Sequence, residues 1–406
     1  MEVQKIMLGG KSVVRLFCMF SAVVAFALLG YTPAAHSAAQ STGDVYVLSN
    51  QPSQNAVIVF HRNADGTLQP GGSFPTGGSG IGSGPNPLNS QGSLILSGDN
   101  RLLFAVNAGS DSITAFAVAG DALTALQTVP SGGTQPVSLT VYHDKLYVLN
   151  AGGTSPNIAG FQIVPEPKQE KMLVPIPGST QILPNGSAAT PAEILFTPDG
   201  RSLLVTEPGA NQVVSFSVSQ AGQAAFVGSF LAPSPSGGPS APSTPGSAPF
   251  GLAFSRDLVI TANTASNTSQ AGSMSSYGVS SSAELAPTSA VPDNQTASTW
   301  AIVAEKGSLA LTTNTMSGTI SSYLVSPKTG TLTLTQPVAA SLMAPDGSSL
   351  MPAGMALSSD GRFLYVRNGA NGTVSGFVIQ ANGSLTQVTQ TQINSLPDTA
   401  AGIAAR

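Results

Sequence analysis

The hydrophobic positions of the chain fall into short apolar stretches that alternate with turns rich in Gly, Asn and Ser. One unit recurs: an apolar strand ending in Asn or a similar residue, a turn, and a second strand with an aromatic residue near its end. Clear copies are LLFAVNAGSDSITAFAV at 102–118, LALTTNTMSGTISSYLV at 309–325 and LYVRNGANGTVSGFVI at 364–379. Apolar stretches of this length, bounded by turn residues, predict an all-β protein.

The aromatic residue marks seven copies of this unit. The seven markers are Phe60, Phe116, Phe161, Phe216, Tyr277, Tyr323 and Phe377. A further strand that ends in a tight turn precedes the unit, as in EILFTPDGR at 193–201, and a weaker strand follows it, as in TLTLT at 331–335. Since seven repeats of four antiparallel strands form a ring, we predict a seven-bladed β-propeller.

The two ends of the repeat region predict how the ring closes. The first copy begins at VYVLSN (45–50) and lacks its leading strand. The tail TAAGIAAR at 399–406 resembles PAGMALSSDGR at 352–362, which is the leading strand of the last copy. We therefore expect the C-terminal strand to complete the first blade, which removes an open sheet edge.

The segment before the repeats has the features of a secretory signal. Basic residues precede the apolar run LFCMFSAVVAFALLG at 16–30, and small residues follow it. Because this run is shorter than the roughly 20 residues that span a bilayer, residues 1–39 are predicted to be a signal peptide, with an uncleaved anchor as the alternative. Residues 40–406 then form a single propeller domain, exported to the periplasm or the exterior. The only cysteine, Cys18, lies in the predicted signal.

The charge content excludes some partners. Only 8% of the residues are charged, and the formal net charge is −4. A chain with so few cations cannot neutralise a row of phosphates, so nucleic-acid binding is excluded. We expect a monomer that has no contact with a membrane once the signal is removed.

The repeats also resemble a known family. The segments LSSDGRFLYVRNGANGTVSGFVI (357–379) and FTPDGRSLLVTEPGANQVVSFSV (196–218) are similar to repeats of the lactonase-type seven-bladed propellers. That group includes 6-phosphogluconolactonase and the carboxymuconate cyclase relatives, and it overlaps the YVTN repeat proteins. The resemblance covers nearly all of residues 44–406. It implies an enzyme that opens or forms a lactone or ester of a small polar acid, without a redox cofactor.

The sequence departs from this family at its histidines. Lactonase-like members carry a Pro-His-x-His segment before the Pro-Asp-Gly hairpin and an acidic turn after the next strand. Here Thr190 and Ala192 stand at the histidine positions. Glu207 keeps the first acid of the later turn, whereas Asn211 replaces the second.

Four residues near the predicted mouth of the central channel are candidates for a site. Glu207 and Arg367 lie in equivalent turns of the fourth and seventh copies, and Glu193 and Trp300 begin innermost strands. Glu207 is the candidate base with Glu193 beside it, and Arg367 is the candidate for binding a substrate carboxylate. Trp300 could stack on a sugar or another planar ligand, or it could plug the channel. The alternative for the charged groups is a solvated loop position or an ion pair that closes the channel.

Metal chemistry has little support in the sequence. His61 and His143, the histidines outside the predicted signal, have no second histidine or carboxylate pair at metal-ligand spacing, so we expect neither a metal nor a cofactor. The loops at 71–92 and 232–249 are Pro-, Gly- and Ser-rich connectors, and 164–177 is a charged insertion. These loops support an alternative function, a non-catalytic propeller that binds a protein or a glycan with its top face.

Overall fold

The computed structural model describes residues 42–164, 172–233, 235, 247–388 and 396–406. The predicted signal peptide (1–39) and the charged centre of the 164–177 insertion lie outside these residues. Residues 40–406 form one compact unit. No helix within the described ranges is both long enough and apolar enough to cross a membrane.

The described chain forms seven antiparallel sheets, each read here from its innermost strand outwards. Blade 1 contains β29 (Ala401–Ala405), β1 (Gly43–Leu48), β2 (Ala56–Arg62) and β3 (Leu68–Pro75). Blade 2 contains β4 (Leu94–Leu96), β5 (Leu102–Asn107), β6 (Ser112–Ala119) and β7 (Ala122–Pro130). Blade 3 contains β8 (Pro136–Tyr142), β9 (Lys145–Asn150), β10 (Asn157–Ile163) and β11 (Leu173–Pro175), and β12 (Gln181–Ile182) also pairs with β10.

The remaining four blades follow the same order. Blade 4 contains β13 (Glu193–Phe196), β14 (Ser202–Glu207), β15 (Gln212–Val218) and β16 (Ala224–Leu231). Blade 5 contains β17 (Pro249–Ser255), β18 (Leu258–Asn263), β19 (Ser273–Val279) and β20 (Leu285–Pro292). Blade 6 contains β21 (Ser298–Ala304), β22 (Leu309–Asn314), β23 (Thr319–Val325) and β24 (Leu332–Ser341). Blade 7 contains β25 (Pro352–Leu357), β26 (Phe363–Asn368), β27 (Thr373–Ile379) and β28 (Leu385–Gln387).

Helical structure is limited to single turns in connections. The four 3₁₀ turns are η1 (Gly186–Ala189), η2 (Pro208–Ala210), η3 (Ala265–Asn267) and η4 (Glu305–Gly307). The seven-bladed all-β prediction is confirmed.

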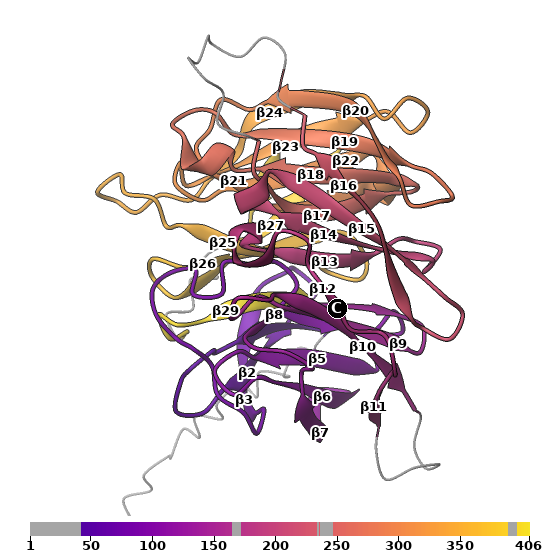
Figure 1. Ribbon diagram of the computed structural model, residues 1–406. Helices are drawn as coiled ribbons and strands as arrows, with labels where there is room; N and C mark the ends of the chain where they lie inside the picture. The colour runs from indigo at the N-terminus through magenta and orange to yellow at the C-terminus, as the bar shows by residue number, and fades with distance from the viewer. Residues whose placement is uncertain (1–41, 165–171, 234, 236–246, 389–395) are drawn as a thin grey trace, which may run out of the picture. The chain divides into compact units, whose positions relative to one another are not determined.

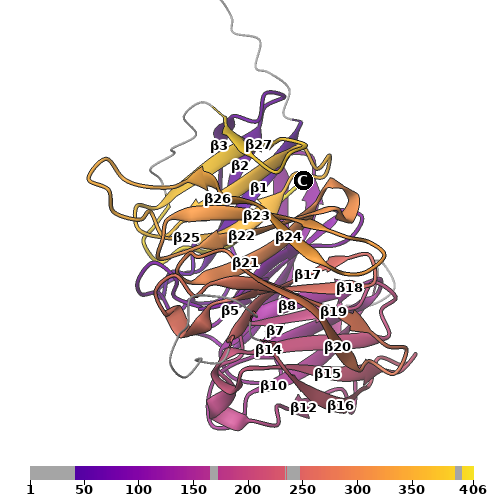
Figure 2. The ribbon, with the colours of Figure 1, turned by 90° about the horizontal axis from the view of Figure 1, so that it is seen from above.

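The C-terminal strand closes the ring as the sequence predicted. β29 pairs with β1, with Val45 opposite Ala405 and Tyr46 opposite Ala404. In Figure 1 the yellow β29 lies beside strands of the first blades, and Figure 2 shows β1 to β3 next to β26 and β27 of the last blade. The first blade is therefore built from both ends of the domain.

The antiparallel order of the strands gives the propeller two different faces. The hairpins that join first to second strands and third to fourth strands lie on one face, called here the lower face. The turns that join second to third strands, together with the connections between blades, lie on the other, the upper face. The tight lower-face turns use positive φ angles, for example +67° at Gly200 and +70° at Gly361, which glycine adopts without steric cost.

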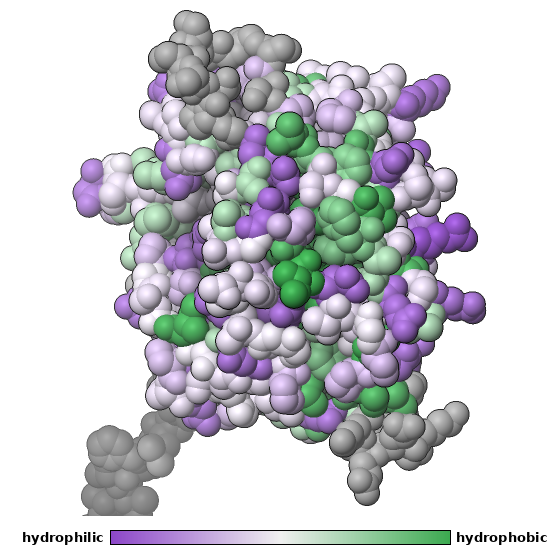
Figure 3. Space-filling view, in the orientation of Figure 1, coloured by the Kyte–Doolittle hydropathy of each residue, from purple (hydrophilic) through white to green (hydrophobic). Residues whose placement is uncertain are grey.

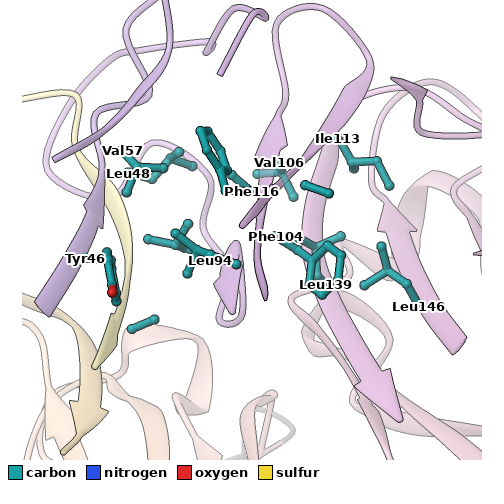
Figure 4. Close-up of a cluster of buried hydrophobic side chains, with 14 of the residues drawn as sticks. Tyr46, Leu48, Val57, Leu94, Phe104, Val106, Ile113, Phe116, Leu139 and Leu146 are labelled. Atoms are coloured by element: carbon teal, nitrogen blue, oxygen red, sulfur yellow. The ribbon is translucent and has the colours of Figure 1, made fainter. Parts of the chain in front are cut away.

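The core lies between the blades, where facing sheets pack their apolar side chains. All seven aromatic markers are at most 2% exposed. Figure 4 shows one such cluster, in which Tyr46 and Leu48 of blade 1 face Leu94 and Phe116 of blade 2, and Phe104 of blade 2 lies beside Leu139 of blade 3. Because each sheet is covered on both sides, its strands are apolar at almost every position, as in β5 and β9.

The predicted connector at 71–92 joins blades 1 and 2 and is partly built into the fold. β3 extends to Pro75, and Leu88 and Ser90 are buried. The last part of this segment runs to the axis of the ring, so it belongs to the core of the domain.

Candidate functional site

An asparagine ends the second strand in most blades and fastens the turn that follows on the upper face. In blades 2, 5, 6 and 7 its side-chain nitrogen donates to two hydroxyl groups of the next strand, at 2.7–3.3 Å. These asparagines are Asn107, Asn263, Asn314 and Asn368. We call each such arrangement an Asn clamp. Its amide donates to the hydroxyls while the whole group is buried, which satisfies polar atoms that would otherwise be costly.

Blade 4 departs from this pattern at Glu207. Glu207 ends β14 at the clamp position, and its partner in register is Gln212 instead of a serine or threonine. Val214 stands where the second hydroxyl would be. A carboxylate only accepts hydrogen bonds, so the clamp cannot form here without an outside donor. Asn185, from the connection between blades 3 and 4, supplies it: its Nδ2 donates to Glu207 Oε2, and to Gln212 Oε1 at 3.0 Å.

The Glu207 carboxyl group is buried and only half satisfied. The residue has no exposed surface, and its Oε1 has no hydrogen-bond partner among the described residues. Burial raises the pKa of Glu207 above its usual value, and the hydrogen bond from Asn185 opposes that rise. The pKa of the Glu207 carboxyl group is thus shifted upwards, in the direction that suits a general base or acid working near pH 7.

Glu193 lies on the other side of the same sheet. It pairs in register with Thr206, so the neighbouring Glu207 points to the opposite face of blade 4. Glu193 Oε2 accepts a 2.5 Å hydrogen bond from the backbone N–H of Leu252 in blade 5. Complete burial holds the pKa of Glu193 well above its usual range. The structure therefore does not bring Glu193 and Glu207 together as a pair.

Gln91 and an apolar cluster lie among the innermost strands next to Glu193. The side chain of Gln91 donates to the carbonyl oxygens of Leu252 (3.1 Å) and Ala301 (2.9 Å) and accepts from the N–H of Ala301 (2.9 Å). Its backbone N–H donates to Ala192 O at 3.0 Å. One residue from the connection between blades 1 and 2 thereby bonds to the inner strands of blades 5 and 6 and to the residue preceding β13 of blade 4.

Trp300 belongs to this apolar cluster. It is 3% exposed and packs edge-on against Phe250, with ring centroids 5.3 Å apart. Ala192 and Ala353 complete the cluster. Trp300 is thus a buried residue of an innermost strand, and both its contact with a ligand and its role as a plug of the channel stay predictions.

Arg367 lies within β26 at the seam between blades 7 and 1, beside Gly354 of β25. It is 2% exposed, and both Nη atoms donate to one acceptor, the carbonyl oxygen of Pro85, at 3.2 and 3.1 Å. Nε has no partner among the described residues. Burial alone lowers the pKa of Arg367 to about 10. It is therefore neither a solvated loop charge nor part of a described ion pair, and its contacts are separate from those of Glu207.

A group that the sequence did not reveal lies on the lower face. Asp44, His61 and Asp121 place ligand atoms within 4.8 Å of one another, a spacing that suits a metal ion. However, Asp44 Oδ2 already binds the Arg406 guanidinium through Nε (2.8 Å) and Nη2 (2.5 Å), and Oδ1 lies 2.8 Å from His61 Nδ1. A guanidinium in contact with the carboxylate disfavours binding of a second cation there. We therefore interpret these residues as contacts that join the start of β1 to the end of β29.

Sequence reasoning missed Asn185 and Gln91. Both lie in connections without regular alternation, so no periodic signal marks them. The one available signal for Asn185 was the exception itself: Glu207 breaks a position that is asparagine in most copies, and a buried acid there needs a donor from elsewhere.

Comparison with known proteins agrees with this fold. The family model for the lactonase seven-bladed β-propeller matches residues 36–182 and 271–397, and the chain belongs to that family. No curated protein matches the sequence.

Solved structures share the whole propeller at low identity. A candidate 6-phosphogluconolactonase of Bacteroides fragilis is 19% identical with a TM-score of 0.63, and the match covers 91% of this chain and 99% of that one. The periplasmic gluconolactonase PpgL of Pseudomonas aeruginosa is 16% identical with a TM-score of 0.65, covering 89% and 98%. A functionally unknown protein of Desulfotomaculum acetoxidans is 13% identical with a TM-score of 0.63, covering 89% and 98%. At these identities the similarity establishes the fold and not the reaction.

Proposed function

We propose that the protein hydrolyses a lactone or ester of a small polar acid, with Glu207 as general base. The observation that carries this proposal is the buried carboxyl group at a position where other blades carry an Asn clamp. Membership of the lactonase family supports the reaction class. The solved relatives described as 6-phosphogluconolactonase and gluconolactonase favour a sugar-acid lactone.

In the proposed reaction, the ionised Glu207 takes a proton from a water molecule as that water attacks the lactone carbonyl. The ring C–O bond then breaks, and the proton passes to the leaving alkoxide oxygen. The product is the open hydroxy acid, and no electron acceptor is needed because hydrolysis is redox-neutral. A base of this kind contributes about 10²–10⁴-fold to rate.

Access to Glu207 requires a local movement of the upper face. Glu207 is buried and immediately precedes η2, Asn185 immediately precedes η1, and the backbone N–H of Gly209 donates to Thr190 Oγ1 at 2.9 Å. Thr190 has a φ of +41°, an uncommon conformation for a β-branched residue. We propose that the 185–190 segment moves away from η2 to admit the substrate.

The test is hydrolysis of a panel of aldonolactones by the purified protein and its Glu207→Gln variant. We expect the variant to lose about 100-fold or more of kcat/KM, because its amide cannot accept the proton. Glu284→Gln, the same change on an exposed lower-face hairpin, is the matched control. The proposal fails if no lactone is hydrolysed above background, or if Glu207→Gln is as active as Glu284→Gln.

A non-catalytic binding propeller is the second candidate. The observation that favours it is the buried cluster of Ala192, Phe250, Trp300 and Ala353 beside Gln91, which packs the innermost strands of several blades together. In this case a protein or glycan would contact the upper-face connections, and Glu207→Gln would alter neither fold nor any hydrolysis.

We also propose that the protein is exported and works as a monomer in the periplasm or outside the cell. The apolar run at 16–30, preceded by basic residues, supports export. Fractionation of the source cells, with N-terminal sequencing of the mature chain, tests this; an intact N-terminus in the cytoplasm would contradict it.

A further inference from the structure

Arg367 is an unusual residue for the interior of a protein. A buried guanidinium is ordinarily paired with a carboxylate, because burial without a counter-charge is unfavourable. Arg367 has no acidic partner in the described part of the chain, and burial is the sole cause of its lowered pKa. Of its five N–H groups, those of the two Nη atoms share a single carbonyl oxygen, and Nε is unpaired.

The position of Arg367 is also unusual among the cations of this domain. It is the one arginine or lysine of the described residues that lies at the upper face. The others end strands or occupy hairpins of the lower face: Arg62, Arg101, Lys145, Arg201, Arg256, Lys306, Lys328, Arg362 and Arg406. An anion arriving at the upper face therefore has one cation available to it.

The segment that covers Arg367 makes few hydrogen bonds, although Pro85 packs against Gly369. Across residues 83–87 the described hydrogen bonds to the rest of the domain are the two from Arg367 to Pro85. The remaining bonds of this segment join Asn86 to Asn89. Gly84 has a φ of +72°, and a Cβ added to it would meet no atom within 4 Å. We call residues 83–87 the Pro85 flap.

We propose that Arg367 is a binding site for a small oxyanion, a carboxylate or a phosphate, which displaces the Pro85 flap. The carbonyl oxygen of Pro85 occupies the place of one oxyanion oxygen. A carboxylate or phosphate would offer two oxygens to the same planar fork and would bring the missing negative charge. This site is separate from Glu207 and does not depend on the proposed hydrolysis.

The experiment is thermal unfolding of the purified protein in inorganic phosphate, in acetate and in chloride at equal ionic strength. At an anion concentration about 100 times its Kd, a ligand of the native state should raise Tm by about 3–4 °C for a domain of this size. A shift in phosphate alone assigns a phosphorylated ligand, and a shift in acetate alone assigns a carboxylate. Equal shifts in all three salts, or none, overturn the proposal.

Variants locate the site. Arg367→Met should fold, because a residue of similar volume replaces an unpaired buried charge, and it should lose the anion-dependent shift. Arg101→Met, which removes an arginine with an 84% exposed side chain, should keep it. If Arg367→Met keeps the shift, the anion binds elsewhere and the proposal is wrong.

Hydrogen exchange on the unaltered protein gives a measurement that does not depend on any variant folding. Phosphate or acetate should speed exchange at the amide of Asn89, because displacement of the flap breaks the hydrogen bond from this N–H to Asn86 O. Binding without faster exchange at Asn89 would contradict the proposed displacement.

Discussion

Exchanging an amide for a carboxyl group changes what one strand position can do. An asparagine at the end of the second strand donates to two hydroxyls of the next strand. Glu207 at the same position cannot donate, so Asn185 must reach in from another connection. The result is a carboxyl oxygen left without a partner, beside a hydrogen bond that sets its acidity.

Asn185→Leu should move the pH dependence of the proposed hydrolysis. Leucine has a similar size but no N–H, so Glu207 loses the hydrogen bond that lowers its pKa. We expect the acid limb of the kcat/KM profile to move to higher pH, while the rate at the alkaline plateau is largely kept. An unchanged limb would show that Asn185 does not set the ionisation of Glu207.

Glu193→Gln should change how stability depends on pH. The raised pKa of Glu193 means that the native state holds a proton that the unfolded chain loses above about pH 4.3. The contribution of Glu193 to the free energy of unfolding is therefore fully present below that pH. Above it, this contribution falls by about 1.4 kcal/mol per pH unit until the native pKa is reached. Glutamine resembles the protonated acid at every pH, so the free energy of unfolding of the variant should lack this decrease with pH.

The measurement for Glu193→Gln is the urea midpoint of both proteins between pH 4 and pH 8. Other buried acids such as Asp293 remain in both, so the difference isolates Glu193. A constant difference across this range would show that Glu193 ionises normally in the native state.

At the scale of the element, the Asn clamp fixes the turn between the second and third strands. In blade 6, Asn314 Nδ2 bonds to Thr319 Oγ1 at 3.0 Å and to Ser321 Oγ at 2.8 Å. The same two strands also bury Tyr323, the aromatic marker. The clamp and the marker thus hold opposite ends of one hairpin.

Asn314→Ala should destabilise the domain by about 1–3 kcal/mol, because two buried hydroxyls lose their donor. Asn382→Ala, on an exposed lower-face hairpin, should cost less than about 1 kcal/mol. The denaturant midpoints of the two variants test this. Equal midpoints would mean that the buried clamp contributes no more than an exposed turn.

The elements were predictable from the sequence because each obeys a local rule. Alternating apolar residues, tight-turn residues and the aromatic markers predicted the strands and their order, and the tail 399–406 predicted the closing strand. The candidate site was less predictable. Glu207 and Arg367 could be named as charges near the upper face, but their burial and their partners depend on Asn185 and Pro85, which lie in irregular connections and meet them only in three dimensions.

For the whole domain, ring closure depends on a buried ion pair as well as on β29. Asp44 has no exposed surface, and it accepts hydrogen bonds from Arg406 and from the hydroxyl of Tyr46. Elsewhere the surface relies on uncharged polar groups: Figure 3 shows hydrophilic side chains interspersed among weakly polar and apolar ones. Because the chain has few charges, we expect this ion pair between the start of β1 and the residue after β29 to contribute to the stability of the ring.

Arg406→Met should destabilise the domain by about 3–5 kcal/mol, because it leaves a buried carboxylate without its cation. Arg101→Met, which removes an exposed arginine, should lie within about 0.5 kcal/mol of the parent protein. Guanidinium unfolding measures both. A small effect at Arg406 would mean that His61 and Tyr46 suffice for Asp44.

The pairing of β29 with β1 has a consequence for the order of events during synthesis. β1 leaves the ribosome long before β29, its inner neighbour, is made. The sheet of blade 1 is therefore incomplete, with one edge of β1 unpaired, until about 350 further residues have emerged. During that interval the nascent chain exposes a β edge that is open to wrong partners, so a companion that shields it, or passage across a membrane before folding, would favour the correct ring.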